Sequence, residues 1–210
     1  MLHEKNRKYA FVHLIRSGGV FTNNTFEASG LTVCNSWRRM NRDWTSEEVA
    51  EHCGNYKNNV MIHNHAIGWN ESLVEFAKSK GFVSFSIIRN PIDQLISSYK
   101  RFDHYKHGTF REFVIRQLER ENSIGREPVT NTALNYMYWE IPTYYKSIET
   151  LIKYDSDLSS KLNFIFGTKH NPVNVNKSIE LSVDLDPDVV ALIKTSEFYI
   201  RYEECLDRCV

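Results

Sequence analysis

The sequence contains few cysteines and has no surplus of charge of either sign. Its 210 residues include four scattered cysteines, and none of them forms a Cys-x-x-Cys pair. This excludes a disulfide framework and a zinc ribbon. The 26 Lys and Arg residues balance the 26 Asp and Glu residues. Without an overall field that would attract a polyanion, we expect no nucleic-acid partner.

Long hydrophobic runs are also missing. The apolar stretches are only a few residues long, and the polar N-terminus lacks the apolar region of a signal peptide. We therefore expect a cytoplasmic protein with no membrane partner. The length predicts one domain over residues 1–210, because a single core can grow to roughly 250 residues before chains divide. No pattern indicates an oligomeric state.

Short apolar runs alternate with segments of helical length. The predicted strands cover 9–15, 31–34, 60–63, 82–88 and 162–166. The predicted helices cover 20–28, a capped segment from 46, 71–80, 92–102, 110–121, 132–154 and a terminal segment from 187. This order predicts an α/β fold in three layers, with a central, mostly parallel sheet covered on both faces. Ligands of such sheets bind at the carboxyl ends of the strands.

A glycine turn follows the first predicted strand. Arg16, Ser17, Gly18 and Gly19 lie between this strand and a predicted helix. The backbone N–H groups of such a turn, the helix dipole and an arginine together favour an anion. The alternative is an ordinary turn with a solvated arginine. The Gly-Lys-Ser/Thr ending of a Walker A loop is absent, which ranks a small nucleotide or metabolite kinase last among the candidate functions.

A second anion-binding pattern follows the fourth predicted strand. Asn90 caps a helix and Pro91 suits its first position, which leaves Arg89 at the strand end beside free N–H groups. Ser97 falls on the polar face of that helix, in the same stripe as its start. Arg89 and Ser97 are therefore predicted to hold one phosphate together. The alternative is a solvated helix face.

These two patterns resemble the motifs of the sulfotransferase family. The stretch from Ile87 to Tyr99 is similar to the family's 3′-phosphate motif, and the stretch from Phe11 to Gly19 is similar to its 5′-phosphosulfate loop. The resemblance implies a P-loop NTPase-like sulfotransferase fold that needs no metal. It implies 3′-phosphoadenosine 5′-phosphosulfate as donor and a hydroxyl acceptor on a carbohydrate or another small molecule.

The resemblance also assigns donor contacts along the chain. Residues 173–178 are similar to the closing region of carbohydrate sulfotransferases, which implies that Lys177 and Ser178 lie near the nucleotide. The phosphosulfate contacts are expected from the glycine turn and the first helical turn, at Arg16, Ser17, Gly18, Gly19, Val20, Phe21 and Thr22.

Two histidines end the third predicted strand. His63 and His65 alternate along it, so both imidazoles are predicted to face one pocket. Transfer to an alcohol needs a group that accepts the hydroxyl proton, and histidine titrates near neutral pH. The His-Asn-His triplet resembles the His-Gly-His segment of uronyl 2-O-sulfotransferases, which implies that His65, and after it His63, is the base. A metal pair or a surface loop is the alternative. His13 is interpreted as a strand residue with a satisfied ring.

One position departs from the family's pattern. Arg16 stands where the family has a lysine, and arginine does not readily give up a proton. Arg16 is still expected to stabilise developing negative charge. A donor-binding or glycan-binding relative with weakened catalysis is the second candidate function. For the acceptor, an aromatic cluster that includes Tyr136 and Trp139 suits a sugar ring, while the alternative places these residues in the core.

Overall fold

The computed structural model describes residues 7–35, 44–56, 59–101, 106, 108–121, 141, 143–167, 169 and 182–210. Within them, five strands form one sheet in the order β2-β3-β1-β4-β5, and each neighbouring pair is parallel. The strands are β1 Lys8–His13, β2 Thr32–Asn35, β3 Val60–His65, β4 Val83–Ile88 and β5 Thr150–Lys153.

The α-helices of the described residues are α1 Gly19–Ala28, α3 Ser46–Asn55, α4 Glu71–Ser79, α5 Pro91–Arg101, α6 Phe110–Glu121, α7 Leu158–Phe166, α8 Pro187–Lys194 and α9 Glu197–Leu206. Two short 3-10 helices accompany them, η1 Ala66–Gly68 and η3 Thr143–Ser147.

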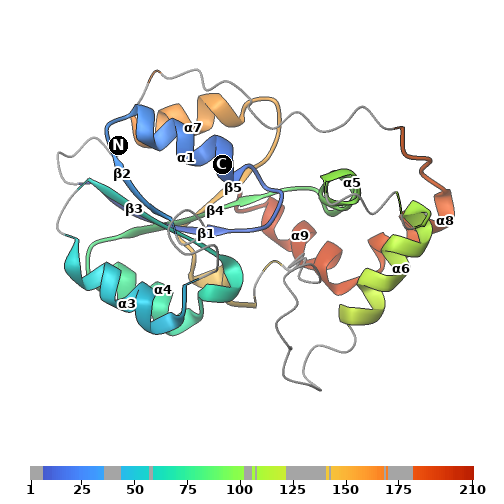
Figure 1. Ribbon diagram of the computed structural model, residues 1–210, viewed down its shortest axis with the longest axis horizontal. Coiled ribbons are helices and arrows are strands. Elements are labelled where there is room, and N and C mark those ends of the chain that lie inside the picture. The colour runs from blue at the N-terminus through green and yellow to red at the C-terminus, as the bar shows by residue number, and fades with distance from the viewer. Residues whose placement is uncertain are drawn as a thin grey trace.

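Helices cover both faces of the sheet. Helices α1 and α7 lie on one face and α3 and α4 on the other, while α5, α6, α8 and α9 gather to one side (Figure 1). Because alternate residues of a strand point to opposite faces, β1 contributes Phe11 to the core under α1 and α7 and Val12 to the core over α3 and α4. The predicted three-layer α/β fold is therefore confirmed.

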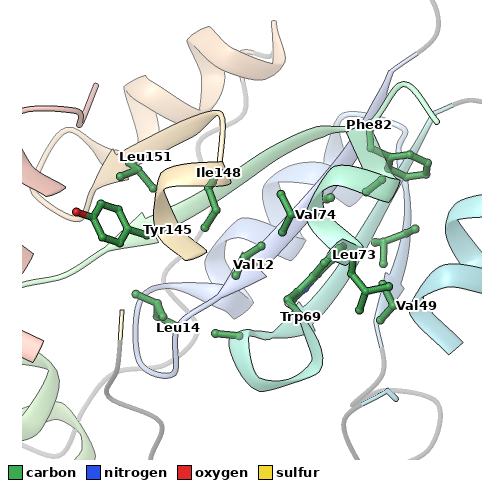
Figure 2. Packing of buried hydrophobic residues seen from close by; sticks show 14 of the residues in the cluster. Val12, Leu14, Val49, Trp69, Leu73, Val74, Phe82, Tyr145, Ile148 and Leu151 are labelled. Carbon is green, nitrogen blue, oxygen red and sulfur yellow. The ribbon is translucent and has the colours of Figure 1, made fainter. Parts of the chain in front are cut away.

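The larger core cluster lies between the sheet and α3, α4 and η3. Figure 2 shows Val12 and Leu14 of the central strand region packed with Val74 and Trp69 from the α4 side. All four side chains are buried. This packing fixes the carboxyl end of β1, where the glycine turn begins.

The strand predicted at residues 162–166 was wrong. Residues 162–166 form the end of helix α7 and not a strand. The buried residues Leu158, Leu162 and Ile165 follow a helical spacing, and Gly167 ends the helix at a φ of 62°. Phe164 points outward and is 84% exposed.

The fifth strand lies instead in a segment that was predicted as the end of helix 132–154. Strand β5 pairs with β4, and its Leu151 and Ile152 are buried in the cores on opposite faces of the sheet. Burial on both faces is what a strand of a covered parallel sheet requires. The predicted terminal helix begins at Pro187 as expected, but it is divided into α8 and α9.

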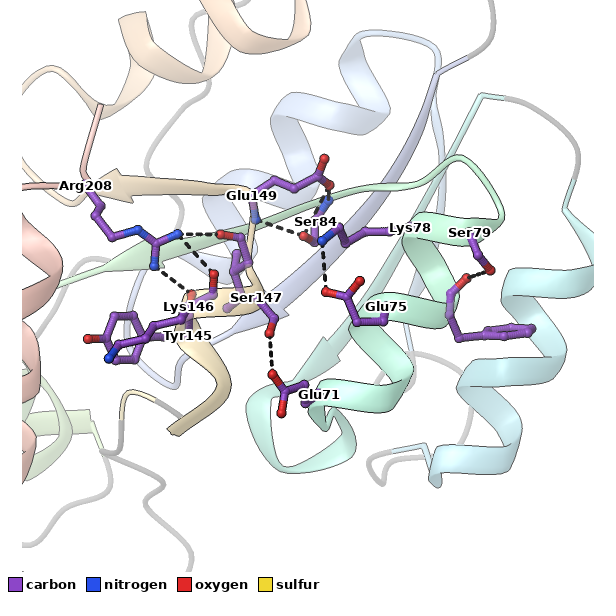
Figure 3. Close-up of polar contacts among 12 residues, drawn as sticks. Glu71, Glu75, Lys78, Ser79, Ser84, Tyr145, Lys146, Ser147, Glu149 and Arg208 are labelled. Atoms are coloured by element: carbon purple, nitrogen blue, oxygen red, sulfur yellow. Dashed lines mark hydrogen bonds and ion pairs between the residues drawn. The ribbon is translucent and has the colours of Figure 1, made fainter.

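Polar contacts fasten β5 to its neighbours. Ser84 N–H and Oγ donate to Glu149 Oε2, and the Ser84 hydroxyl accepts from Glu149 N–H, at 2.8, 3.4 and 3.0 Å respectively. Arg208 donates to the carbonyls of Tyr145 and Ile148 at 3.1 and 2.9 Å (Figure 3). We call the contacts made by Ser84, Glu149 and Arg208 the edge clamp.

Candidate active site

The turn between β1 and α1 has an unusual backbone. Arg16 has a φ of 63°, in the left-handed region that side-chain-bearing residues rarely adopt, and Gly18 has a φ of 82°. Ser17 N–H donates to the Leu14 carbonyl at 3.1 Å and closes the turn. Gly18 is the N-cap of α1 and provides no side-chain cap. The first N–H groups of α1 are therefore available to an anion.

Both glycines of the turn lie close to aromatic rings, and Gly19 has no room for a Cβ atom. A Cβ atom on Gly19 would lie 2.5 Å from His13 Nε2, and a Cβ atom on Gly18 would lie 3.1 Å from Tyr154 Cε2. The His13 ring cannot easily move away, because it stacks on Phe11 and its Nδ1 is within hydrogen-bond distance of His63 Nε2. The two predicted glycine positions thus bring the turn against β1 and the end of β5.

The second predicted motif lies directly against this turn. Arg16 donates from Nε and from a terminal guanidinium nitrogen to Ser97 Oγ, at 3.1 and 2.9 Å. Arg89 donates to the Arg16 carbonyl at 2.8 Å. Asn90 caps α5 as predicted, because its Oδ1 accepts from Ile92 N–H at 2.9 Å. The glycine turn and the start of α5 therefore form one site at the carboxyl ends of β1 and β4.

The site is electropositive. Burial lowers the pKa of Arg16, and the neighbouring Arg101 and Arg89 lower it further, while Tyr154 acts weakly in the opposite direction. No carboxylate of the described residues is among the groups that shift it. Arg89 also stacks over the Tyr154 ring, with its guanidinium carbon 4.6 Å from the ring centroid. Clustered arginines favour a multiply charged anion.

Several buried polar atoms around the turn lack hydrogen-bond partners within the described parts of the chain. They are Ser17 Oγ, Arg89 Nε and His13 Nε2. An unsatisfied buried polar atom costs about 1–3 kcal/mol, so a group of them points to a ligand that completes their hydrogen bonds.

The two predicted histidines lie on β3, next to the end of β1 from which the glycine turn begins. His65 pairs in register with His13 at the carboxyl ends of β3 and β1, and His63 pairs with Phe11. The rings of His63 and His65 have centroids 6.3 Å apart. His63 is 6% exposed, whereas His65 is half-buried, so His65 is the better placed of the two to reach a substrate.

The remaining predicted positions differ in what their side chains do. Val20 is 45% exposed and Phe21 packs on the core under α1, so neither apolar side chain offers a polar contact. The Thr22 hydroxyl donates to the Gly18 carbonyl at 2.9 Å. Four further predicted residues lie outside the described residues: Lys177, Ser178, Tyr136 and Trp139.

Three residues that help to form the site were not predicted. Gln94 donates to the Ile15 carbonyl at 2.6 Å and holds the turn from α5. Tyr154 lies under the Arg89 guanidinium, and its ring occupies the space next to Gly18 that a Cβ atom would need. His13 was interpreted as having a satisfied ring, which holds for Nδ1 but is wrong for Nε2. Only Gln94 carried a sequence signal, since it lies one helical turn from the predicted N-cap.

No protein-family model matches the chain, and no curated protein matches it either. Among solved structures, the crystal structure of a sulfotransferase from Alicyclobacillus acidocaldarius is similar, with a TM-score of 0.51 and 11% identity over 97% of each chain. An uncharacterized protein from Eubacterium ventriosum matches with a TM-score of 0.38 and 9% identity, over 78% of this chain and 99% of that chain.

The first of these likenesses extends over nearly the whole chain and shows the fold. The chain shares the α/β fold of that sulfotransferase, with a central parallel sheet flanked by helices. Within the described ranges, no three potential ligand side chains gather into a metal site. None of the helices described is both long and apolar enough to cross a bilayer.

Proposed function

We propose that this chain is a sulfotransferase that transfers the sulfuryl group of 3′-phosphoadenosine 5′-phosphosulfate to a hydroxyl, with a carbohydrate as the preferred acceptor class. The observation that carries the proposal is the contact between the two anion-binding motifs. Ser97 accepts from Arg16, and Arg89 donates to the Arg16 carbonyl. A donor with a phosphate at one end and a phosphosulfate at the other needs two such motifs in one site.

The residues present suit that donor. Arg89 and Ser97 are proposed to bind its 3′-phosphate, and the N–H groups at Gly18 and Gly19 its 5′-phosphosulfate. Arg89 Nε and Ser17 Oγ, which lack partners within the described residues, would be satisfied by phosphate oxygens. Lys177 and Ser178 stay proposed as further donor contacts, on the basis of sequence alone.

His65 is proposed as the general base. The acceptor oxygen forms a bond to sulfur while the bond from sulfur to the bridging phosphate oxygen breaks, and the hydroxyl proton moves to a ring nitrogen of His65. The products are the sulfated acceptor and 3′-phosphoadenosine 5′-phosphate. When bound, the donor supplies the sulfuryl group, and the chain supplies orientation, a base and fixed positive charge.

Arg16 is proposed to stabilise charge and not to donate a proton. Burial lowers its pKa, but a guanidinium stays charged at neutral pH. Because the guanidinium already contacts Ser97, it lies at the junction of the two proposed phosphate sites. A fixed donor at this point acts on the developing negative charge.

Calorimetry with 3′-phosphoadenosine 5′-phosphate tests the donor site. Arg89→Ala is expected to weaken binding about 10- to 100-fold, because a hydrogen bond to a charged group contributes about 1.5–3 kcal/mol. Arg111→Ala is the matched control, since Arg111 forms an exposed ion pair with Asp186 on the surface and its loss is expected to leave the affinity unchanged. No binding of the nucleotide by the unmodified protein at millimolar concentration would refute the donor site.

Labelled-donor assays against glycans and small alcohols test the chemistry. His65→Ala is expected to reduce turnover about 10²–10⁴-fold while nucleotide affinity is retained. Full turnover in this variant contradicts the role of His65. Nucleotide binding without transfer to any acceptor favours the second candidate, a binding protein with weakened catalysis, which the arginine at position 16 suggests. Binding of ATP with magnesium in place of the sulfated nucleotide would favour a kinase.

A further inference from the structure

Three histidines from two strands meet at the carboxyl end of the sheet. His13 ends β1, and its neighbours on β3 are His65, directly across in register, and His63, one pleat away. The rings of His13 and His63 rest on Phe11, with centroids 5.2 and 4.9 Å from its ring. Phe11 in turn stacks on Phe85, so the rings of His13 and His63 pack on apolar aromatic side chains.

One ring nitrogen of His13 has a hydrogen-bond partner among the described residues, and the other has none. Its Nδ1 lies 2.9 Å from His63 Nε2, a hydrogen-bond distance, and the centroids of these two rings are 4.8 Å apart. Its Nε2 is buried and has no hydrogen-bond partner in the described parts of the chain. The His65 ring has its centroid 4.9 Å from that of His13, nearly the spacing at which the His13–His63 hydrogen bond forms. This spacing is short enough for a hydrogen bond between a ring nitrogen of the half-buried His65 and His13 Nε2 once the His65 ring is suitably turned.

From these contacts we propose that His13 is a positioning residue for His65: His13 Nε2 accepts a hydrogen bond from one ring N–H of His65, and His13 Nδ1–H donates to His63 Nε2. This inference rests on the proposed role of His65 as base. With its proton directed at His13, His65 presents the lone pair of its other ring nitrogen to the acceptor hydroxyl. The arrangement follows the general rule that a catalytic base is oriented by a third group.

The surroundings of His13 keep it neutral, as this role requires. Burial lowers the pKa of His13 well below its usual value, and the positive forms of His63 and His65 from β3 and of Arg16 from the turn lower it further. The contact from α1 is Gly19, which does not titrate. A neutral His13 accepts a hydrogen bond but does not take up the proton. When His65 becomes charged during transfer, its bond to His13 becomes charge-assisted and stronger.

A pair of variants of similar shape separates the acceptor from the packing role. His13→Gln keeps a side-chain oxygen that can accept from His65, while His13→Met fills a similar volume without a comparable acceptor. Both are expected to disturb the contact with Gly19 to a similar extent, so their affinities for 3′-phosphoadenosine 5′-phosphate should match. Turnover is expected to stay within about 3-fold of the unmodified protein in the glutamine variant and to fall about 10-fold or more in the methionine variant, below the full contribution of a base.

The pH profile and the tautomer of His65 provide readouts that a packing role does not change. Loss of the acceptor removes a hydrogen bond that favours the charged form of His65. The acid limb of kcat/KM should then move to lower pH in His13→Met and not in His13→Gln. By ¹⁵N NMR, we expect one fixed tautomer of His65 in the unmodified protein and in His13→Gln, and a mixture in His13→Met.

The NMR measurement does not depend on turnover, so it distinguishes this inference from the proposed function. If no acceptor is sulfated but His65 has one tautomer that His13→Met releases, the proposed reaction fails and the hydrogen bond stands. If transfer occurs but His65 is a tautomer mixture in the unmodified protein, or has the same tautomer and titration midpoint in both variants, the role of His13 is overturned. The tautomer of the unmodified protein decides the question even if His13→Met does not fold.

Discussion

The two ends of strand β4 use polar residues in opposite ways. At its amino end, Ser84 forms three hydrogen bonds with Glu149 in the edge clamp, and Arg208 completes the clamp with contacts to backbone carbonyls. At its carboxyl end, neither Arg89 Nε nor Ser17 Oγ of the adjoining turn has a hydrogen-bond partner among the described residues. The polar groups at the amino end have their partners within the protein, whereas these two atoms at the carboxyl end have none among the described residues.

On the proposed function, this difference separates groups that stabilise the fold from groups that bind a ligand. A polar group whose hydrogen bonds are complete within the protein adds stability and has little left to offer a substrate. A cluster of buried groups with incomplete hydrogen bonds lowers stability and persists where binding completes it. Substitutions at the amino end of β4 should therefore change unfolding, and those at the carboxyl end should change nucleotide binding.

The largest expected effect is at the turn itself. Gly19→Ala should reduce the affinity for 3′-phosphoadenosine 5′-phosphate about 100-fold or more, because the added Cβ would lie 2.5 Å from His13 Nε2 and must displace the turn or the ring. Calorimetry measures the loss. Gly54→Ala is the matched control, since Gly54, like Gly19, lies in a helix without a positive φ but has open space around its Cβ position. Equal nucleotide affinity in the two variants would contradict a special role for the turn.

At the other end of β4 we expect a change in stability alone. Glu149→Ala removes the acceptor of the buried Ser84 N–H and should lower the free energy of unfolding by about 1–2 kcal/mol, with nucleotide affinity unchanged. Urea denaturation and calorimetry check the two parts. Glu75→Ala is the matched control, because Glu75 forms an exposed pair with Lys78 whose loss should change stability by less than about 0.5 kcal/mol. Weaker nucleotide binding in Glu149→Ala would contradict the division of roles between the two ends of β4.

The parts of the site that could be predicted from the sequence are those that local residues determine. The glycine turn and the start of α5 are local: Gly18, Asn90 and Pro91 each determine the backbone within a few residues of themselves. The parallel strands that position them are short apolar runs, and their type could be predicted from their length and flanks. The positions of Arg16, Arg89 and Ser97 at one site followed from the rule that ligands bind at the carboxyl ends of parallel strands.

Strand β5 could not be predicted in the same way, because distant contacts fix it. Glu149 just before it bonds to Ser84, and the chain end closes on it through Val210 N–H, which donates to the Leu151 carbonyl at 2.9 Å. No local pattern in four residues distinguishes this strand from a helix end. The Nε2 atom of His13, which has no hydrogen-bond partner among the described residues, is a similar case, since its surroundings depend on where Gly19 and the β3 histidines lie.

The smallest expected effect concerns pH and the buried His13. Its pKa is held well below the usual 6.5 in the folded state, chiefly by burial. Below pH 6.5 the unfolded chain therefore takes up a proton that the folded chain does not, so the stability that this group contributes is complete above pH 6.5 and is lost as the pH falls below it. A single group changes the free energy of unfolding by at most about 1.4 kcal/mol per pH unit.

His13→Gln removes that dependence. Between pH 7.5 and 5.5 the free energy of unfolding of the unmodified protein should fall by about 1 kcal/mol more than that of His13→Gln, as measured by urea denaturation. The other titratable groups are present in both proteins, so the difference between the two slopes isolates His13. Equal slopes in the two proteins would mean that the folded protein lets His13 take up a proton as easily as the unfolded chain does. In that case the carboxyl end of the sheet would already be open to solvent, and its unsatisfied groups would be hydrated and not held ready for a ligand.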